Sequence, residues 1–444
     1  MADKSKRLGS ERVGKLLFDF SLPAIIGTAT FGSTSIINTI FVGRGVGSLA
    51  LTAISLSGPI FMIFMSVGML VGIGSGALTS IRLGEGKTDE AERILGNAFF
   101  LFLSLAAVTA LLGLTFIDPM LRAFGASRES LPLARDYIRI LMAGVVLNYL
   151  TMGMNNLIRA EGNPNIAMLT LIIGALINVT LNYVFVFRLG VGIQGAALAT
   201  IISQSVSSAW ALAHFRPGHG TLVLRARNIL PDRRIILSIL PLGLPMFLMQ
   251  LSGSLMGMVA NNALGRNGGD VAIGAMGVIV SISMFLLMPI IGINQGSQPV
   301  FGYNFGARRF DRVKRALRLA IMAATIIATT GFLVVHLVPE PLIRLFNRDP
   351  GLVAVTEHGI RIFMAMFFLV GFQAVSANFF LSIGKPYLSI FLNLLRQVIL
   401  FIPLVLILPS FFKLDGVWIS GPISDALAVG ITLIVLVVQY RRLK

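Results

Sequence analysis

The chain has 444 residues, of which 55% are hydrophobic and only 12% charged, and its mean hydropathy is +0.86. This composition excludes an ordinary soluble globular protein and indicates an integral membrane protein. The absence of cysteine excludes disulfides, thiolate nucleophiles and cysteine-ligated metals. A net charge of +17 would also suit a nucleic-acid partner, but in a membrane protein basic residues report topology first.

Long apolar runs follow one another along the chain, and each provides the roughly 20 residues that a membrane-spanning helix needs. Short polar or Pro/Gly-bearing segments separate them. The runs cover residues 16–41, 48–81, 94–117, 134–158, 166–187, 194–213, 235–264, 271–301, 317–338, 360–381, 387–408 and 417–438. The sequence therefore predicts an all-α integral membrane protein with twelve transmembrane helices.

The Lys and Arg residues are distributed unevenly between the two sides that these spans define. The two tails and the even-numbered connections hold about three times as many as the odd-numbered connections. The positive-inside rule therefore places both termini in the cytoplasm, in a multi-pass protein of the inner, or cytoplasmic, membrane. The basic segment GARRFDRVKRALR is then a topology signal, and we expect no nucleic-acid partner.

The chain repeats itself at an offset of 222 residues. LPAII aligns with LPMFL through Pro23 and Pro245, and EGNP aligns with IGKP through Pro164 and Pro386; DPMLRAFG with EPLIRLFN and YIRIL with GIRIF keep the same offset. Six helices in each half are an even number, so both halves enter the membrane in the same orientation. The sequence thus predicts two six-helix lobes related by a pseudo-twofold axis along the membrane normal.

The expected organisation follows from this repeat. A cytoplasmic N-terminal tail (1–15) precedes the first lobe (16–214), a cytoplasmic linker (215–234) and the second lobe (235–440), and a short cytoplasmic tail (441–444) ends the chain. Two-lobed bundles of this type usually place a binding cavity between the lobes, which favours a transporter.

In their order and spacing, several segments resemble one family over nearly the full length. They are SLPAII followed by IFVGRGVGSLALTAISLSGP, LGEGKTDEAERI, RAEGNP, LGVGIQGAALAT, GINQGSQPVFGYNFGARR, SIGKP and DGVWISGPISD. The chain resembles the multidrug and toxic compound extrusion (MATE) transporters, in their DinF/MepA-like bacterial branch. The resemblance implies an antiporter that exchanges an outward-moving organic compound for an inward-moving H⁺ or Na⁺ as its lobes rock between two states.

The resemblance also implies an ion-coupling cluster in the first lobe. The matching positions are Asn38, Asn178, Asn182 and Thr200, and two of them depart from the family pattern, because Asn38 and Asn182 stand where the family commonly has Asp. An amide cannot carry a proton. Its carbonyl oxygen can ligate Na⁺, but without the negative charge that offsets dehydration of the ion. The alternative interpretation is that these amides only connect helices by hydrogen bonds.

The second lobe keeps two ionisable residues inside predicted spans, Arg396 and Asp425. Helical rise places both at about 12–14 Å from opposite faces of a roughly 30 Å core, so their depths nearly coincide. We expect them to pair. If protons drive transport, Asp425 is the best remaining candidate, and the alternative is a static ion pair. At the end of the fourth span, Arg159 is the expected neighbour of Glu161.

Amides supply the expected polar points of a substrate cavity that is otherwise lined by Met and Phe. These points are Asn156, Gln250, Gln295 and Gln298, together with Arg396. Pro23 and Pro245 are candidate hinges, although a fixed kink is an equal alternative.

The sequence therefore predicts a monomeric secondary antiporter for amphipathic organic compounds, with membrane lipids around it. No cofactor or resident metal is expected apart from transported H⁺ or Na⁺. The alternatives are a lipid or glycolipid flippase of the same superfamily and a transport-arrested or uncoupled variant. An enzyme is not expected, because the four histidines fall at helix ends or in loops and no catalytic pair occurs within a span.

Overall fold

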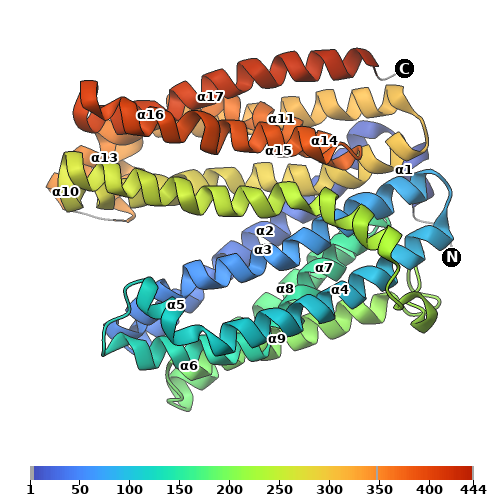
Figure 1. The fold of residues 1–444 in the computed structure, drawn as a ribbon, viewed down its shortest axis with the longest axis horizontal. Helices are drawn as coiled ribbons and strands as arrows, with labels where there is room; N and C mark the ends of the chain where they lie inside the picture. The colour runs from blue at the N-terminus through green and yellow to red at the C-terminus, as the bar shows by residue number, and fades with distance from the viewer. Residues whose placement is uncertain (1–4, 347–348, 443–444) are drawn as a thin grey trace.

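The computed structural model describes residues 5–346 and 349–442, and all regular structure within them is helical (Figure 1). The first part of the chain forms α1 (Lys6–Ser10), α2 (Val13–Gly45), α3 (Ser48–Gly84), α4 (Thr88–Thr115), α5 (Ile117–Ala123), α6 (Ser130–Ala143), α7 (Val145–Ala160), α8 (Pro164–Asn182), the π-helix η1 (Tyr183–Arg188) and α9 (Ile193–His214). A loop with one 3₁₀ turn, η2 (Ala226–Asn228), then leads to the second part.

The second part of the chain repeats this pattern. It forms α10 (Arg233–Gly306), α11 (Phe310–Leu337), α12 (Pro339–Arg344), α13 (Pro350–Phe363), the 3₁₀ turn η3 (Phe367–Leu369), α14 (Val370–Ser382), α15 (Pro386–Leu394), the π-helix η4 (Leu395–Leu400), α16 (Phe401–Ile407) and α17 (Pro409–Arg442). The fifth span of each lobe therefore contains a π-helix, at its end in the first lobe and in its middle in the second, which the sequence analysis did not predict.

Helix α10 accounts for two spans. Its 74 residues would extend about 110 Å if straight, more than three times a hydrocarbon core of roughly 30 Å. Gly269, with φ of 64° and ψ of −161°, breaks it, because this backbone conformation is readily available only to glycine. The pairs α6–α7 and α13–α14 bend by 53° and 47° and each form one span. Counted in this way, the part of the chain that the structure describes has the twelve predicted spans.

The helices form two lobes, blue to green and yellow to red in Figure 1. Both termini and the loop between α9 and α10 lie at one end of the bundle, which we call the tail end; the opposite end is the far end. The ribbons of the two lobes lie together at the tail end and diverge toward the far end. The all-helical, two-lobed fold class expected from the sequence is confirmed.

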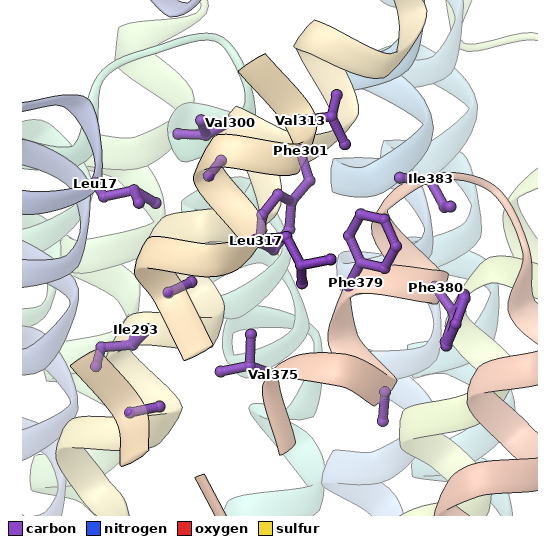
Figure 2. Close-up of a cluster of buried hydrophobic side chains, with 14 of the residues drawn as sticks. Leu17, Ile293, Val300, Phe301, Val313, Leu317, Val375, Phe379, Phe380 and Ile383 are labelled. Carbon is purple, nitrogen blue, oxygen red and sulfur yellow. The ribbon is translucent and has the colours of Figure 1, made fainter. Parts of the chain in front are cut away.

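The first helix of each half packs into the other lobe at the tail end. Leu16, Leu17 and Phe20 of α2 belong to the same buried core as Val300 and Phe301 of α10, and Figure 2 shows Leu17 beside that helix. In the other direction, Ile239 and Leu242 at the start of α10 belong to the buried core of the first lobe. This exchange ties the lobes together and follows the internal repeat.

Glycines allow the lobes to approach backbone to backbone at the tail end. A methyl group on Gly243 would lie 1.6 Å from the carbonyl oxygen of Leu70, and one on Gly306 would lie 2.1 Å from that of Ile81, so neither position accepts a side chain. In the far-end half of α3, by contrast, a methyl group on Gly58 would meet no atom within 4 Å. The tail end is therefore the closed end of this conformation.

The two candidate hinges, Pro23 and Pro245, lie inside α2 and α10. The non-helical residues within long helices are elsewhere, at Gly269 of α10 and Lys413 of α17. The hinge role of the two prolines stays a prediction.

Candidate functional site

Three asparagines from two helices meet inside the first lobe. The Asn182 side-chain nitrogen donates to Asn38 Oδ1 at 2.8 Å and to Asn178 Oδ1 at 3.2 Å. Asn178 and Asn182 are one helical turn apart on α8, so they share a face, and Asn38 reaches them from the far-end half of α2. Asn182 is fully buried and Asn178 nearly so. The expected meeting of the three amides is confirmed.

Helix α9 closes this cluster with two hydroxyl groups. The Asn178 side-chain nitrogen lies 3.3 Å from Thr200 Oγ1 and 3.4 Å from Ser203 Oγ. Thr200 was expected here from the family resemblance, whereas the sequence analysis missed Ser203. Its spacing was the available signal, because a residue three positions after Thr200 lies on the same helix face.

One oxygen of the cluster has no partner. Asn182 Oδ1 is buried and accepts no hydrogen bond, which is unusual for a buried carbonyl oxygen. The π-helix η1 begins at the next residue, Tyr183, and such insertions occur frequently at functional sites. Amide and hydroxyl oxygens are ligands that Na⁺ accepts, so the donor set fits that ion. Because none of the five side chains is ionisable, the cluster itself cannot hold a transported proton.

The second lobe has an ion pair within its spans. Arg396 Nε donates to Asp425 Oδ1 at 2.5 Å, and the carboxylate side chain is only 10% exposed. Arg396 lies in the π-helix η4 and Asp425 in α17. The pairing expected from their matching depths is confirmed.

The repeat relates this pair to the first-lobe cluster. Asp425 lies 222 residues after Ser203, so the last span of each lobe presents a polar group at the equivalent position. The equivalents of Asn178 and Asn182 are Leu400 and Leu404. The two lobes thus use one position differently, with an amide and hydroxyl cluster in the first and a carboxylate paired with arginine in the second.

Three of the expected cavity residues lie instead at the closed contact between the lobes. Arg159 of α7 donates to Gln295 Oε1 of α10 across the lobes and to Asn156 Oδ1 at 2.7 Å on its own helix. The Gln298 side-chain nitrogen donates to the Ile73 carbonyl oxygen at 3.3 Å, also across the lobes. The sequence analysis did not include Arg159 among the cavity residues.

The remaining expected cavity residues are not brought to this contact. Gln250 is partly buried in the first half of α10, and Arg396 belongs to the ion pair of the second lobe. A cavity of about 330 Å³ occurs at the tail end, between the start of α2 and the loop that precedes α8, and none of the five expected residues lines it. The structure thus places Asn156, Gln295 and Gln298 at the lobe contact, and a shared cavity lined by all five residues stays a prediction.

Glu161 is not paired with Arg159, and the sequence expectation was wrong on this point. Its carboxylate contacts His214 Nε2 at the end of α9 and accepts from Asn163 Nδ2 at 2.7 Å. It also accepts from the backbone nitrogens of Thr221 and Leu222, at 3.2 and 3.1 Å. The loop after Glu161 turns its side chain toward the linker, away from the lobe contact where Arg159 points.

A two-lobed bundle of twelve spans, closed at one end and with polar clusters inside both lobes, defines a membrane transporter. The family model described as MatE matches this chain twice, over residues 23–184 and 245–407. The two matches begin 222 residues apart and together cover most of the chain. The protein therefore belongs to the MatE family, whose members are transporters rather than enzymes.

Individual relatives extend over nearly the whole chain. The multidrug export protein MepA of Staphylococcus aureus (strain N315) is 27% identical over 97% of this chain and 95% of its own length. A solved outward-facing multidrug resistance MATE transporter of the MOP superfamily is 25% identical, with a TM-score of 0.92 over 98% of both chains.

A MOP superfamily transporter from Pyrococcus furiosus, also 25% identical, has a TM-score of 0.93 over 100% of this chain and 99% of its own. A reversed polarity of its binding pocket is reported to suggest a different function for that protein.

Proposed function

We propose that this protein exports amphipathic organic compounds by alternating access, in exchange for inward-moving H⁺ or Na⁺. The observation that carries the proposal is the contact of the two lobes, backbone to backbone, at the tail end, while the far-end half of α3 has an open face at Gly58. Cargo would enter from the tail end in the opposite conformation and leave at the far end. Family membership and the multidrug export relatives support this direction.

The distribution of basic residues supports a cytoplasmic tail end in the bacterial inner membrane. Both tails and the linker carry Lys and Arg in excess over the far-end loops. The protein acts as a monomer on amphipathic substrates within the lipid bilayer, and neither a cofactor nor nucleic acid takes part.

Ion coupling is divided between the lobes in this proposal. The first-lobe cluster of Asn38, Asn178, Asn182 and Thr200 binds Na⁺ weakly at best, because its amides lack the charge that offsets dehydration of the ion. Asp425 is the one candidate of the five that can change its protonation. Protonation would release Arg396, which would link proton binding to a change inside the second lobe.

A lipid or glycolipid flippase is the second candidate, because arginines lie inside the spans of both lobes. Arg159 is buried at the lobe contact, and the Arg396 side chain is 33% exposed beside Asp425. Both cations suit an anionic headgroup. Export of a soluble compound and translocation of a lipid are separable by experiment.

The test is dye movement across proteoliposomes under an imposed pH or Na⁺ gradient. The unchanged chain is compared with Asp425→Asn, with the double variant Asn38→Asp/Asn182→Asp, and with Arg128→Gln as a far-end surface control. We expect transport by the unchanged chain and loss of proton dependence in Asp425→Asn. The double variant should raise the Na⁺ response, since carboxylates add the missing charge.

Two results would contradict this. If dye does not move in any variant while a fluorescent lipid analogue crosses between leaflets, the protein is a lipid flippase and the export hypothesis is wrong. If the unchanged chain ignores both gradients and only the double variant responds, the chain is an uncoupled form and Asp425 is a structural partner of Arg396.

A further inference from the structure

Arg159 is a buried cation without a counter-charge. The residue is 7% exposed, and its guanidinium contacts the amide oxygens of Gln295 and Asn156. No carboxylate forms an ion pair with it among residues 5–346 and 349–442. Glu161, two positions along, directs its oxygens to His214, Asn163 and the linker backbone. Buried arginines are normally paired, so this arrangement needs a reason.

The second lobe has no charge at the position equivalent to Arg159. The internal repeat places Asn378 at the position equivalent to Asn156 and Leu381 at the position equivalent to Arg159. In the second lobe Asn378 donates to the Asn294 carbonyl oxygen at 2.9 Å. The second lobe therefore has a hydrogen-bonded neutral amide, Asn378, at the place where the first lobe has Asn156 beside Arg159. At this pair of equivalent positions, only the first lobe carries a guanidinium.

The position of Arg159 between the lobes determines in which conformation a ligand can reach its guanidinium. Arg159 belongs to α7 of the first lobe and Gln295 to α10 of the second, eleven residues before Gly306 at its tail-end terminus. That distance is about 16 Å along the helix, so the contact lies within the bundle rather than at its surface. Separation of the lobes at the tail end breaks the contact with Gln295. The Arg159 guanidinium then faces the opening between the lobes.

We infer that Arg159, with Asn156 beside it, binds the anionic group of an amphipathic cargo, a sulfonate, carboxylate or phosphate, when the tail end is open. Gln295 contacts the guanidinium in the closed state, and separation of the lobes frees the guanidinium for the cargo. A guanidinium presents paired donors that match such oxyanions, whereas an amide cannot supply the charge. The inference rests on the proposed export function and adds the charge class of the cargo.

The test uses two probes that share one fluorophore. N-dansyl-taurine carries a sulfonate, and N-dansylaminoethyl-trimethylammonium carries a cation on the same two-carbon linker. Uptake of each into energised inside-out vesicles, and fluorescence titration of the detergent-purified protein, are measured for the unchanged chain, Arg159→Gln, Arg159→Lys and Gln295→Leu.

We expect the unchanged chain to take up the sulfonate probe. Arg159→Gln should weaken its binding at least about tenfold, the effect of losing a charge-assisted hydrogen bond, while the trimethylammonium probe stays within about twofold. Arg159→Lys should restore part of the sulfonate binding, which also shows that the site tolerates substitution. Gln295→Leu removes the closed-state partner and should leave the sulfonate preference in place.

Three outcomes overturn the inference, and they separate it from the proposed function. Equal losses for both probes in Arg159→Gln, matched by Gln295→Leu, would mean that Arg159 only holds the lobes closed. Transport of the trimethylammonium probe alone by the unchanged chain would leave export standing and remove the anion site. Transport of neither probe, nor of any dye in the gradient assay, would end both proposals.

Discussion

At the scale of single residues, buried polar groups at the tail end hold the linker to the first lobe. Glu161 is completely buried. Its carboxylate contacts His214 and accepts hydrogen bonds from Asn163 and from two backbone nitrogens of the linker. Farther along the linker, the Val223 nitrogen donates to Glu92 Oε1 at 3.2 Å. The linker is therefore anchored to the lobe that precedes it.

Replacing Glu161 by Ala should destabilise the first lobe and release the linker. The change leaves His214 and two backbone donors buried without their acceptor, and breaking a buried pair costs about 3–5 kcal/mol. The midpoint temperature of thermal unfolding in detergent should fall, and proteolysis within residues 215–232 should become faster. Glu340→Ala is the matched control, since Glu340 pairs with Arg344 at the surface, where such pairs contribute less than about 1 kcal/mol. Equal effects of the two changes would contradict the anchoring role.

At the scale of elements, the short helix α1 connects the two lobes. It precedes α2 of the first lobe but docks on the second, where Leu8 is fully buried. The Asn304 side-chain nitrogen donates to the Leu8 carbonyl oxygen at 3.0 Å, and Arg312 Nη2 donates to the same oxygen at 3.2 Å and to the Glu11 carbonyl oxygen at 2.6 Å. Residues 5–12 are thus a fixed part of the closed tail end.

Arg312→Ala should loosen α1. Two backbone carbonyls lose a charged donor, which is expected to raise the local opening of residues 5–12 at least about tenfold. Hydrogen exchange of that segment measures the effect. Arg315→Ala, an exposed neighbour on the same helix, should leave the exchange unchanged. Slow exchange in Arg312→Ala would show that packing of Leu8 alone fixes the helix.

At the scale of the whole molecule, the tail-end contact must open in each transport cycle if alternating access operates. Gln298 of α10 touches the Ile73 carbonyl of α3 across this contact. The chain has no cysteine, so an introduced pair has no competing partner.

A bis-methanethiosulfonate cross-linker that joins Ile73→Cys and Gln298→Cys should therefore stop transport, and reduction should restore it, because the reagent spans more than the short Cβ–Cβ distance that a direct disulfide needs. Gradient-driven dye movement is measured before the reagent is added, after cross-linking and after reduction, with each single cysteine variant as control. Undiminished transport by the fully cross-linked protein would rule out opening at this end.

The sequence predicted the elements and their repetition because both depend on local composition. Runs of about 20 apolar residues become helices in lipid, where each backbone group needs an internal partner. The 222-residue offset set the two lobes, and the four-residue spacing of Asn178 and Asn182 placed both amides on one face. Equal depth was enough to pair Arg396 with Asp425, since two opposite charges within the same layer of a bundle stabilise each other.

Only the tertiary structure decided which side chains meet across the lobes. The sequence assigned Asn156, Gln295 and Gln298 to a cavity, but their place at a closed contact depends on how far the lobes have rotated, which no local pattern encodes. The partner of Glu161 was assigned from sequence adjacency, whereas a turn after α7 sends it to His214, 53 residues away. The exposed or buried state of Arg159 likewise follows from the packing of α7 against α10, because long-range contacts are set by the assembled bundle and not by its separate helices.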